Sequence, residues 1–168
     1  MVEIVLTDKQ YKNLPYKDTS IPRSKTYGDI LGLLGGHDIQ DYKFLRVGGN
    51  EVLSFPLRIK RGDVTQTFEI KLSVPKLMYP VKLGRGTYAK KTMTYLENVS
   101  WRVFWWHLKS KFEAIEYGIS DEIREFMYNI TYSLEDGEGN KREVVVGDEI
   151  IKNLEQLPRL SALALEEK

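Results

Sequence analysis

The sequence predicts an α+β fold in which an antiparallel sheet packs on a long central aromatic helix. Residues 95–117 contain no glycine or proline, include all three tryptophans, and repeat apolar side chains at spacings of three and four. That pattern is typical of a buried helix. Residues 51–74 alternate apolar and polar side chains on both sides of an Arg-Gly-Asp turn, which predicts a β-hairpin. Shorter C-terminal helices and a second small hairpin are expected after Gly118.

The predicted central helix is apolar on two opposed faces. One face carries Trp101, Phe104, Trp105, Leu108, Phe112 and Ile115, and the other carries Leu96, Val99, Val103, Trp106, Ala114 and Tyr117. Because each apolar face needs cover, we expect the sheet on one side and short helices, the second hairpin or a second subunit on the other. Gly118 is placed to end the helix in a left-handed conformation, with Ile119 packing back on it.

Before the first hairpin, the sequence predicts a strand, a loop, a short helix and a second strand. The first strand is residues 2–6, and the polar residues 8–25, interrupted by two prolines, are expected to be loop. Thr26 can cap a helix that stops at Gly36, and residues 43–47 form the next strand.

Between the hairpin and the central helix, the prediction is less regular. Pro56 indicates that the first hairpin strand is an edge strand or is bulged. Residues 75–86 contain two prolines and two glycines and are expected to be irregular. We expect one domain, and any division of it falls at 75–86. A helix is predicted to begin near Thr87 and to continue into the central helix.

After the central helix, Ser120 is expected to cap a second helix with acidic residues in its first turn. Residues 130–134 and 143–146 are predicted to be paired strands joined by a turn at 136–140. Asp148 is expected to cap the last regular helix.

The composition is that of a soluble globular protein, with 42% hydrophobic and 29% charged residues in a chain of 168. The absence of cysteine excludes disulfides and cysteine nucleophiles, and together with abundant Lys, Glu, Ile and Tyr it is typical of a thermostable protein. No strongly apolar run approaches the length of a membrane span, and residues 1–9 lack the pattern of a secretory signal. We therefore expect a cytoplasmic protein without membrane, cofactor or metal.

The net charge of +1 conceals an asymmetry along the chain. Residues 70–96 contain six basic residues and no acidic one, whereas residues 113–149 contain eleven acidic and three basic residues. The first part can attract an anionic partner. Alternatively, the two parts face each other, within one chain or across a dimer.

The second half carries a recognisable series of residues. They are Trp101-Arg102, Lys109-x-Lys111-Phe112-Glu113-Ala114-Ile115-Glu116-x-Gly118-Ile119, the acidic helix after Ser120, the Asp136-Gly137 turn and Val146-Gly147-Asp148. Over residues 100–157 this series is similar to a segment of short uncharacterised bacterial proteins. The aromatic residues 101–106 and the longer turn, 138–140, depart from that segment. The resemblance implies the order helix, helix, strand, helix and no function.

A basic region at 58–91 is a candidate surface for nucleic acid or another anion. Its members are Arg58, Lys60, Arg61, Lys82, Arg85, Lys90 and Lys91, with Tyr79 and Tyr88 among them. Basic side chains neutralise phosphates and aromatic rings stack on unpaired bases. Glycines at 84 and 86 can also form an anion-binding turn at a helix start. The alternative is that these lysines only protect strand edges from pairing.

His37 and Asp38 follow a Gly-Gly pair and are the candidate catalytic residues. A histidine can act as a base near neutral pH, and a carboxylate can orient it. The alternative is a polar loop that ends a short helix, because the chain has one other histidine and no nucleophile motif.

Trp101, Trp105 and Trp106 are candidate interface residues, because aromatic side chains dominate binding hot spots. They can equally belong to the core. The leading functional hypothesis is therefore a non-enzymatic binding or assembly protein that forms a homo-oligomer or binds a protein partner. A nucleic-acid- or phosphate-binding protein is the alternative, and a hydrolase-type enzyme centred on His37 and Asp38 comes third.

Overall fold

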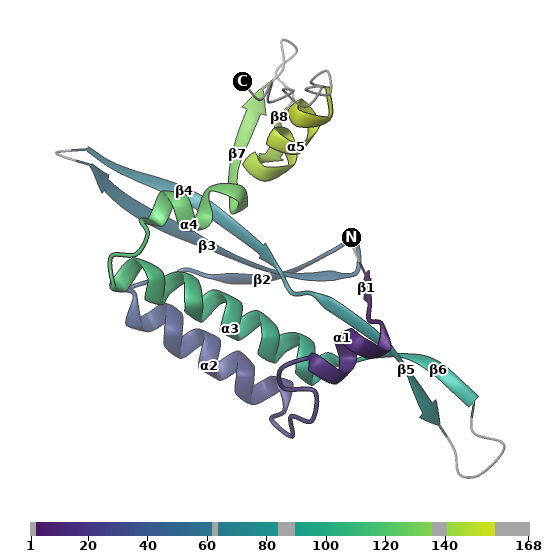
Figure 1. Cartoon of the computed structure of the whole chain (residues 1–168). Coiled ribbons are helices and arrows are strands. Elements are labelled where there is room, and N and C mark those ends of the chain that lie inside the picture. Colours follow the sequence, from purple (N-terminus) through teal and green to yellow (C-terminus); the bar gives the residue numbers. More distant parts are fainter. Residues whose placement is uncertain (1–2, 62–63, 84–89, 136–140, 157–168) are drawn as a thin grey trace, which may run out of the picture.

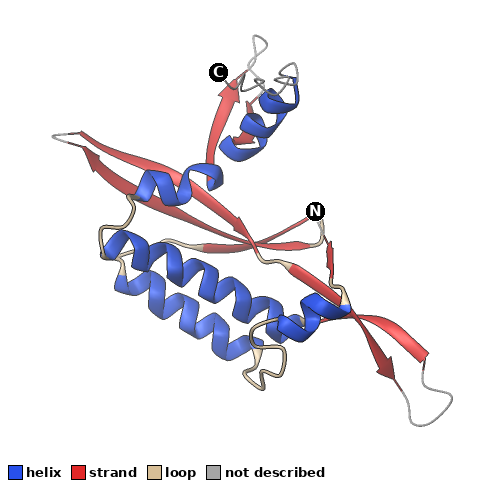
Figure 2. Ribbon diagram, in the orientation of Figure 1, coloured by secondary structure: helices blue, strands red, loops and turns tan. Residues whose placement is uncertain are grey.

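The computed structural model describes residues 3–61, 64–83, 90–135 and 141–156. It shows an α+β fold, as the sequence predicts, with a five-stranded sheet, a three-stranded sheet and several helices (Figures 1 and 2). Among the described helices, none has the length and apolar character required to cross a membrane.

The larger sheet has the strand order β2-β3-β4-β7-β8, and all neighbouring strands are antiparallel. Its strands are β2 (Lys43–Val47), β3 (Asn50–Arg61), β4 (Val64–Ser73), β7 (Ile130–Glu135) and β8 (Lys141–Val145). The predicted hairpins are both present. However, the expectation that the second hairpin covers the far face of the central helix is wrong. It extends the sheet, because Ile130 and Thr131 pair with Ile70 and Glu69.

The smaller sheet consists of β1 (Glu3–Val5), β5 (Lys76–Leu83) and β6 (Lys90–Tyr95). β5 pairs with β1 in parallel and with β6 in antiparallel orientation. The predictions of irregular chain at 75–86 and of a helix running on from Thr87 are therefore wrong where these residues are described. The alternation in β6, in which Met93 and Tyr95 share one face, is the local signal for a strand.

Two prolines lie inside strands at positions where one neighbouring strand has already ended. Pro56 lies in β3 beyond Ser54, the last residue that pairs with β2, so one side of β3 is locally an edge there. Pro80 lies in β5 beyond Met78, the last residue that pairs with β1. A proline has no N–H to donate, and a strand tolerates it where one neighbour has ended. The register of β3 with β4 continues through Pro56, so the strand has an open edge rather than a bulge.

The N-terminal helices are α1 (Asp8–Asn13) and α2 (Arg23–Gly36). α1 lies within the stretch predicted as loop, and it forms because Thr7 and Gln10 make a capping box. α2 begins before the predicted cap, and Thr26 is fully buried inside it. α2 lies beside α3 (Glu97–Glu116), and both cover one face of the larger sheet (Figure 1).

α3 ends as predicted at Gly118, whose φ angle is +68°. The N–H of Gly118 donates to the carbonyl of Ile115 at 3.0 Å, and that of Ile119 donates to the carbonyl of Ala114 at 2.9 Å. These two bonds satisfy the last carbonyls of the helix. Ile119 does not pack back on the helix, because it is 77% exposed.

The C-terminal helices are α4 (Glu122–Phe126), the 3₁₀ turn η2 (Met127–Asn129) and α5 (Val146–Gln156). The predicted caps are both displaced. Asp121 rather than Ser120 caps α4, by accepting a 2.9 Å bond from the N–H of Arg124. α5 begins at Val146, directly after β8, so Asp148 lies in its first turn.

The core lies between α3 and the covered face of the larger sheet. Trp101, Phe104, Leu108 and Phe112 of α3 are buried against apolar residues of β3 and β4. On the opposite stripe of α3, Val99 is buried against Leu6 and Leu77 of the smaller-sheet region, in a second apolar cluster. Further along the same stripe, Trp106 is 37% exposed. The second stripe is therefore covered at its N-terminal end and open later.

Candidate ligand-binding cleft

A cleft lies on the face of the larger sheet that α2 and α3 leave open. Figure 1 shows the β7–β8 hairpin and α5 on the opposite side of β3 and β4 from α2 and α3. The cleft has a volume of about 560 Å³. Its lining residues are Leu45, Val47, Val52, Lys71, Leu72, Ser73, His107, Tyr128, Asn129, Thr131, Glu143, Val145 and Asp148.

The strands that form the cleft floor present aliphatic side chains. Leu45 of β2 and Val52 of β3 are cross-strand partners, and Val47 shares their face because side chains alternate along a strand. Val52 is 9% exposed and Val47 is 58% exposed, so the floor is buried at Val52 and open to solvent at Val47. An aliphatic floor of this kind favours an apolar ligand.

An ion pair joins two walls of the cleft. Lys71 of β4 pairs with Glu143 of β8, and the Lys71 side chain is 20% exposed whereas that of Glu143 is 66% exposed. Lys71 is the more buried partner of the pair. A ligand bound beside Lys71 therefore keeps the lysine charge partly shielded from water.

The hydroxyl of Thr131 is buried in the wall without a partner. Thr131 is 8% exposed, and its Oγ1 has no hydrogen-bond partner in the described part of the chain. A buried hydroxyl without a partner costs about 1–3 kcal/mol of stability. Most buried polar groups are satisfied, so this exception calls for a specific explanation.

His107 of α3 also lines the cleft. Among the described residues of β4, Glu69 and Ile70 pair with β7, and the rest of that edge of β4 has no strand beside it. The cleft reaches α3 there, through His107. Partial burial and the positive charge of Lys111 lower the pKa of His107, and the charge of Glu125 acts in the opposite direction. The imidazole is therefore neutral at pH 7 and can both donate and accept a hydrogen bond.

The remaining polar groups of the cleft can form hydrogen bonds with a ligand. Asn129 and Tyr128 offer an amide and a phenol, and Asp148 is an exposed carboxylate. In the described residues, no group of three His, Cys, Asp or Glu side chains is arranged to hold a metal ion. Polar and charged residues make up about half of the cleft lining, beside its aliphatic floor.

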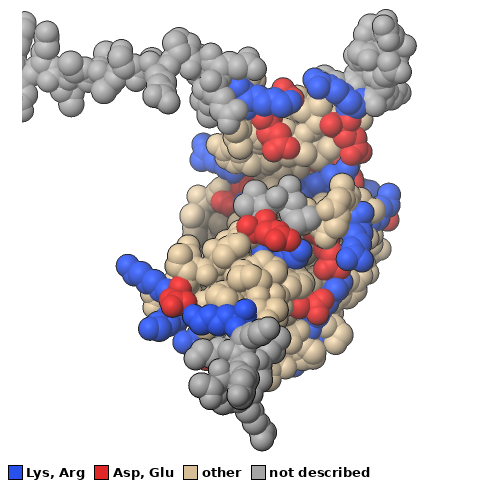
Figure 3. Space-filling view, turned by 90° about the vertical axis from the view of Figure 1, so that its right-hand side faces the viewer, with Lys and Arg blue, Asp and Glu red and all other residues tan. Residues whose placement is uncertain are grey.

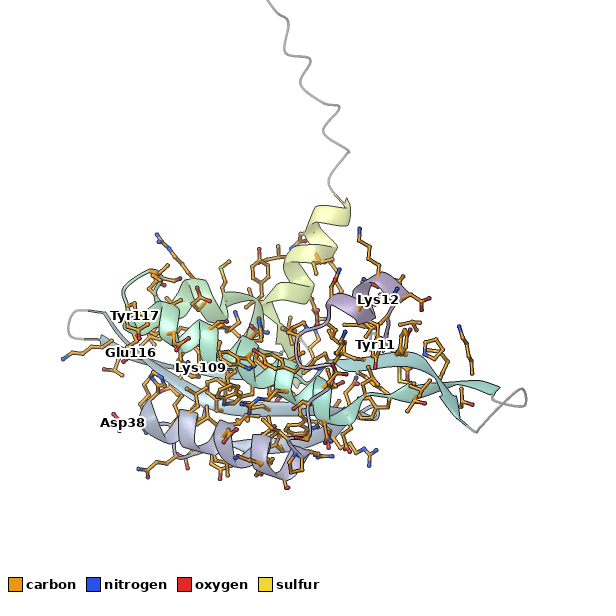
Figure 4. The ribbon with its side chains drawn as sticks, turned by 60° about the horizontal axis from the view of Figure 1, so that its bottom comes forward. Tyr11, Lys12, Asp38, Lys109, Glu116 and Tyr117 are labelled. Carbon is orange, nitrogen blue, oxygen red and sulfur yellow. The ribbon has the colours of Figure 1, made fainter. Side chains whose placement is uncertain are left out.

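The predicted catalytic residues lie in a different pocket, of about 510 Å³. His37 ends α2, and its ring stacks on Phe112 with the centroids 4.3 Å apart. Asp38 has a φ angle of +58° and projects from the end of α2 (Figure 4). The structure also brings Arg58 of β3 to this pocket, which joins residues from two of the predicted sites. A catalytic role for His37 and Asp38 stays a prediction.

The predicted basic region does not form one surface. Arg58 and Lys60 lie near the tip of the β3–β4 hairpin, whereas Lys82, Lys90 and Lys91 lie in the β5–β6 hairpin, and Figure 1 shows the two tips at opposite ends of the molecule. The view from the β5–β6 end shows blue Lys and Arg interspersed with red Asp and Glu (Figure 3).

Other members of the basic region are engaged elsewhere or lie outside the description. Tyr79 stacks on Tyr11 with the centroids 3.8 Å apart, and its hydroxyl donates to Asp8 at 2.9 Å. Arg61 is the last residue of β3. Arg85 and Tyr88, with the predicted anion-binding turn at 84–87, lie outside the described residues.

The three tryptophans have different environments. Trp101 is fully buried in the core, which is the alternative role expected for the tryptophans. Trp105 is partly buried, with the Arg102 guanidinium 4.1 Å from its ring centroid. Trp106 is at the surface, where it stacks on Tyr16 at 5.7 Å. Lys109, Glu116 and Tyr117 follow along the outer side of α3 (Figure 4).

Comparison with protein-family models, with curated proteins and with solved structures finds no match to this chain. The resemblance of residues 100–157 to short uncharacterised bacterial proteins stays a prediction. Sequence reasoning missed the cleft because its walls come from β4, β8 and α5, whose approach no local pattern indicates. The one available signal was the alternation of β2, which places Leu45 and Val47 on one face.

Proposed function

We propose that the protein is a non-enzymatic binding protein that holds a small, mainly apolar molecule in the cleft on the open face of its larger sheet. The observation that carries the proposal is the buried, unpartnered hydroxyl of Thr131 in the lining of a cleft that also has an aliphatic floor. A ligand with a polar end gives this hydroxyl a partner after a rotation of its side chain. The apolar remainder of the ligand contacts Leu45, Val47 and Val52.

The test uses 8-anilinonaphthalene-1-sulfonate, a probe with an apolar body and one anionic group. Its fluorescence is titrated with the purified protein and with Val47→Glu, which places a charge on the cleft floor. Val5→Glu is the matched control, because Val5 of β1 is 59% exposed and Val47 is 58% exposed. The loss of one aliphatic contact amounts to about 1 kcal/mol, so the affinity of Val47→Glu is expected to fall about fivefold. Equal affinities for the two variants would contradict the proposal.

The β5–β6 hairpin favours a second candidate function, the binding of a nucleic acid. Its register pairs the backbone of residue 82 with that of residue 91, and the sequence has a lysine at both positions. Like charges across a strand pair are unfavourable. An anionic partner removes this repulsion. Binding of a single-stranded oligonucleotide should weaken steeply with salt and should weaken further in Lys91→Glu. No binding at low salt would rule out this second function.

A further inference from the structure

β2 forms one edge of the larger sheet. It pairs with β3 alone among the described strands, so its other backbone edge has no strand beside it. Two of its side chains, Lys43 and Arg46, are exposed and charged, which protects an edge from indiscriminate pairing. Val47, in contrast, is an aliphatic residue that is 58% exposed at the end of the same strand.

The sequence of β2, Lys-Phe-Leu-Arg-Val, is complementary to itself in an antiparallel register centred on Leu45. In this register Leu45 meets the partner's Leu45, and Lys43 meets the partner's Val47. Arg46 meets the partner's Phe44, an arrangement that allows a cation–π contact. No like charges are directly opposite, although Arg46 and the partner's Arg46 are diagonal neighbours, so the pairing avoids the largest electrostatic penalty of joining identical strands.

The opposite edge of the sheet behaves differently. β8 has the sequence Lys-Arg-Glu-Val-Val, and an antiparallel pairing centred on this strand sets Glu143 opposite the partner's Glu143. Two carboxylates at a two-fold axis repel each other. In the registers centred on each strand, the β2 edge is therefore better suited to a second copy than the β8 edge.

We propose that two copies of this chain associate through their β2 strands, in antiparallel register about a two-fold axis at Leu45. The two larger sheets then form one continuous sheet across the dimer. The pairing also covers Val47 and brings the aliphatic floors of the two clefts together, because Leu45 and Val47 belong to both surfaces. Two strands of this length bury less area than a typical stable interface, so the dimer dissociates on dilution.

The test is the mass of the protein in sedimentation velocity over a range of concentrations, with Leu45→Lys and Leu45→Glu. Each variant alone sets like charges at the two-fold axis and is expected to lose the dimer. An equimolar mixture of the two sets Lys opposite Glu and is expected to recover it. Leu45 is only partly buried and lies on the open face, and circular dichroism checks that both variants are folded.

Val5→Lys is the control, because it adds a charge at an exposed strand valine outside β2. It should leave the dimer intact. The inference is overturned if the unaltered protein is a monomer at every concentration, if Leu45→Lys still dimerises, or if the mixture stays monomeric. Probe binding in the cleft and the mass of the protein are measured separately on the unaltered protein, so absence of the dimer and absence of the proposed function are distinguishable.

Discussion

The two faces of the larger sheet are built from alternate residues of the same strands, yet they differ in burial and in the satisfaction of their polar groups. On the covered face, Leu53, Phe55 and Ile70 are fully buried against α3 and its neighbours. On the open face, Val47 is exposed and Thr131 has a buried hydroxyl without a partner. The covered face supplies stability, and it thereby allows the open face to keep groups that are suboptimal for folding.

The largest expected effect comes from the covered face. Phe55 contacts Phe112 and Phe126, with ring centroids 6.2 and 5.8 Å away. Phe55→Ala should lower the free energy of unfolding by about 3–5 kcal/mol, because it leaves a cavity among buried rings. Val47→Ala on the open face should change it by less than about 0.5 kcal/mol. Urea denaturation of both variants measures the contrast, and similar losses would show that the two faces are not distinct.

The next effect concerns the wall that α5 adds to the open face. A Cβ at Gly147 would lie 2.7 Å from the backbone oxygen of Tyr128, so only glycine allows α5 to pack this closely on η2. Gly147→Ala should lower the free energy of unfolding by about 1–3 kcal/mol. Gly32→Ala is the matched helix control, because nothing lies within 4 Å of its new methyl group. That control should be more stable by about 0.5–1 kcal/mol, and a destabilised Gly32→Ala would invalidate the comparison.

The sequence predicted those parts whose signals are local. Alternation and an Arg-Gly-Asp turn indicated β3 and β4, and the spacing of aromatic residues indicated α3 and its end at Gly118. α1 was missed because Thr7 and Gln10 were not recognised as a capping box. β5 was missed because Pro80 indicated a loop, although β1 ends before it and leaves that edge open.

The candidate cleft could not be predicted, because its shape depends on contacts between distant segments. The pairing of β7 with β4 rests on two residue pairs, Ile70 with Ile130 and Glu69 with Thr131. No periodicity distinguishes this placement from a hairpin that packs on α3. Alternation within β2 indicates only that Leu45 and Val47 share a face, and the observed register with β3 adds Val52 to it. Alternation did not indicate that Val145 of β8 would lie opposite them across the cleft.

A smaller effect is expected from the two buried hydroxyls that lack partners among the described residues. Thr131 lies on the open face and Thr26 lies in α2 on the covered side, and each is at least nine-tenths buried. Replacement of either by the isosteric valine should raise the free energy of unfolding by about 1 kcal/mol, because it removes a desolvated hydroxyl. Urea denaturation provides the measurement. A loss of stability in Thr131→Val alone would mean that its hydroxyl has a partner in solution, such as water in the cleft.

The smallest expected effect is the dependence of stability on pH through His107. Burial, reinforced by the charge of Lys111, lowers the pKa of His107 in the folded state below its ordinary value of 6.5. Above pH 6.5 the residue is neutral in both states and contributes no pH dependence. As the pH falls below 6.5, the unfolded chain binds the proton more readily, so the folded state loses relative stability until its own lowered pKa is reached.

His107→Gln removes this titration and retains hydrogen-bonding groups in the side chain. The melting temperatures of the two proteins are measured from pH 7.5 to pH 5, a range in which other groups affect both proteins alike. The melting temperature of the unaltered protein should fall more steeply below pH 6.5 than that of His107→Gln. Parallel curves would mean that the imidazole is as accessible to protons in the folded protein as in the unfolded chain. In that case His107 would belong to the exposed rim of the cleft and not to its wall.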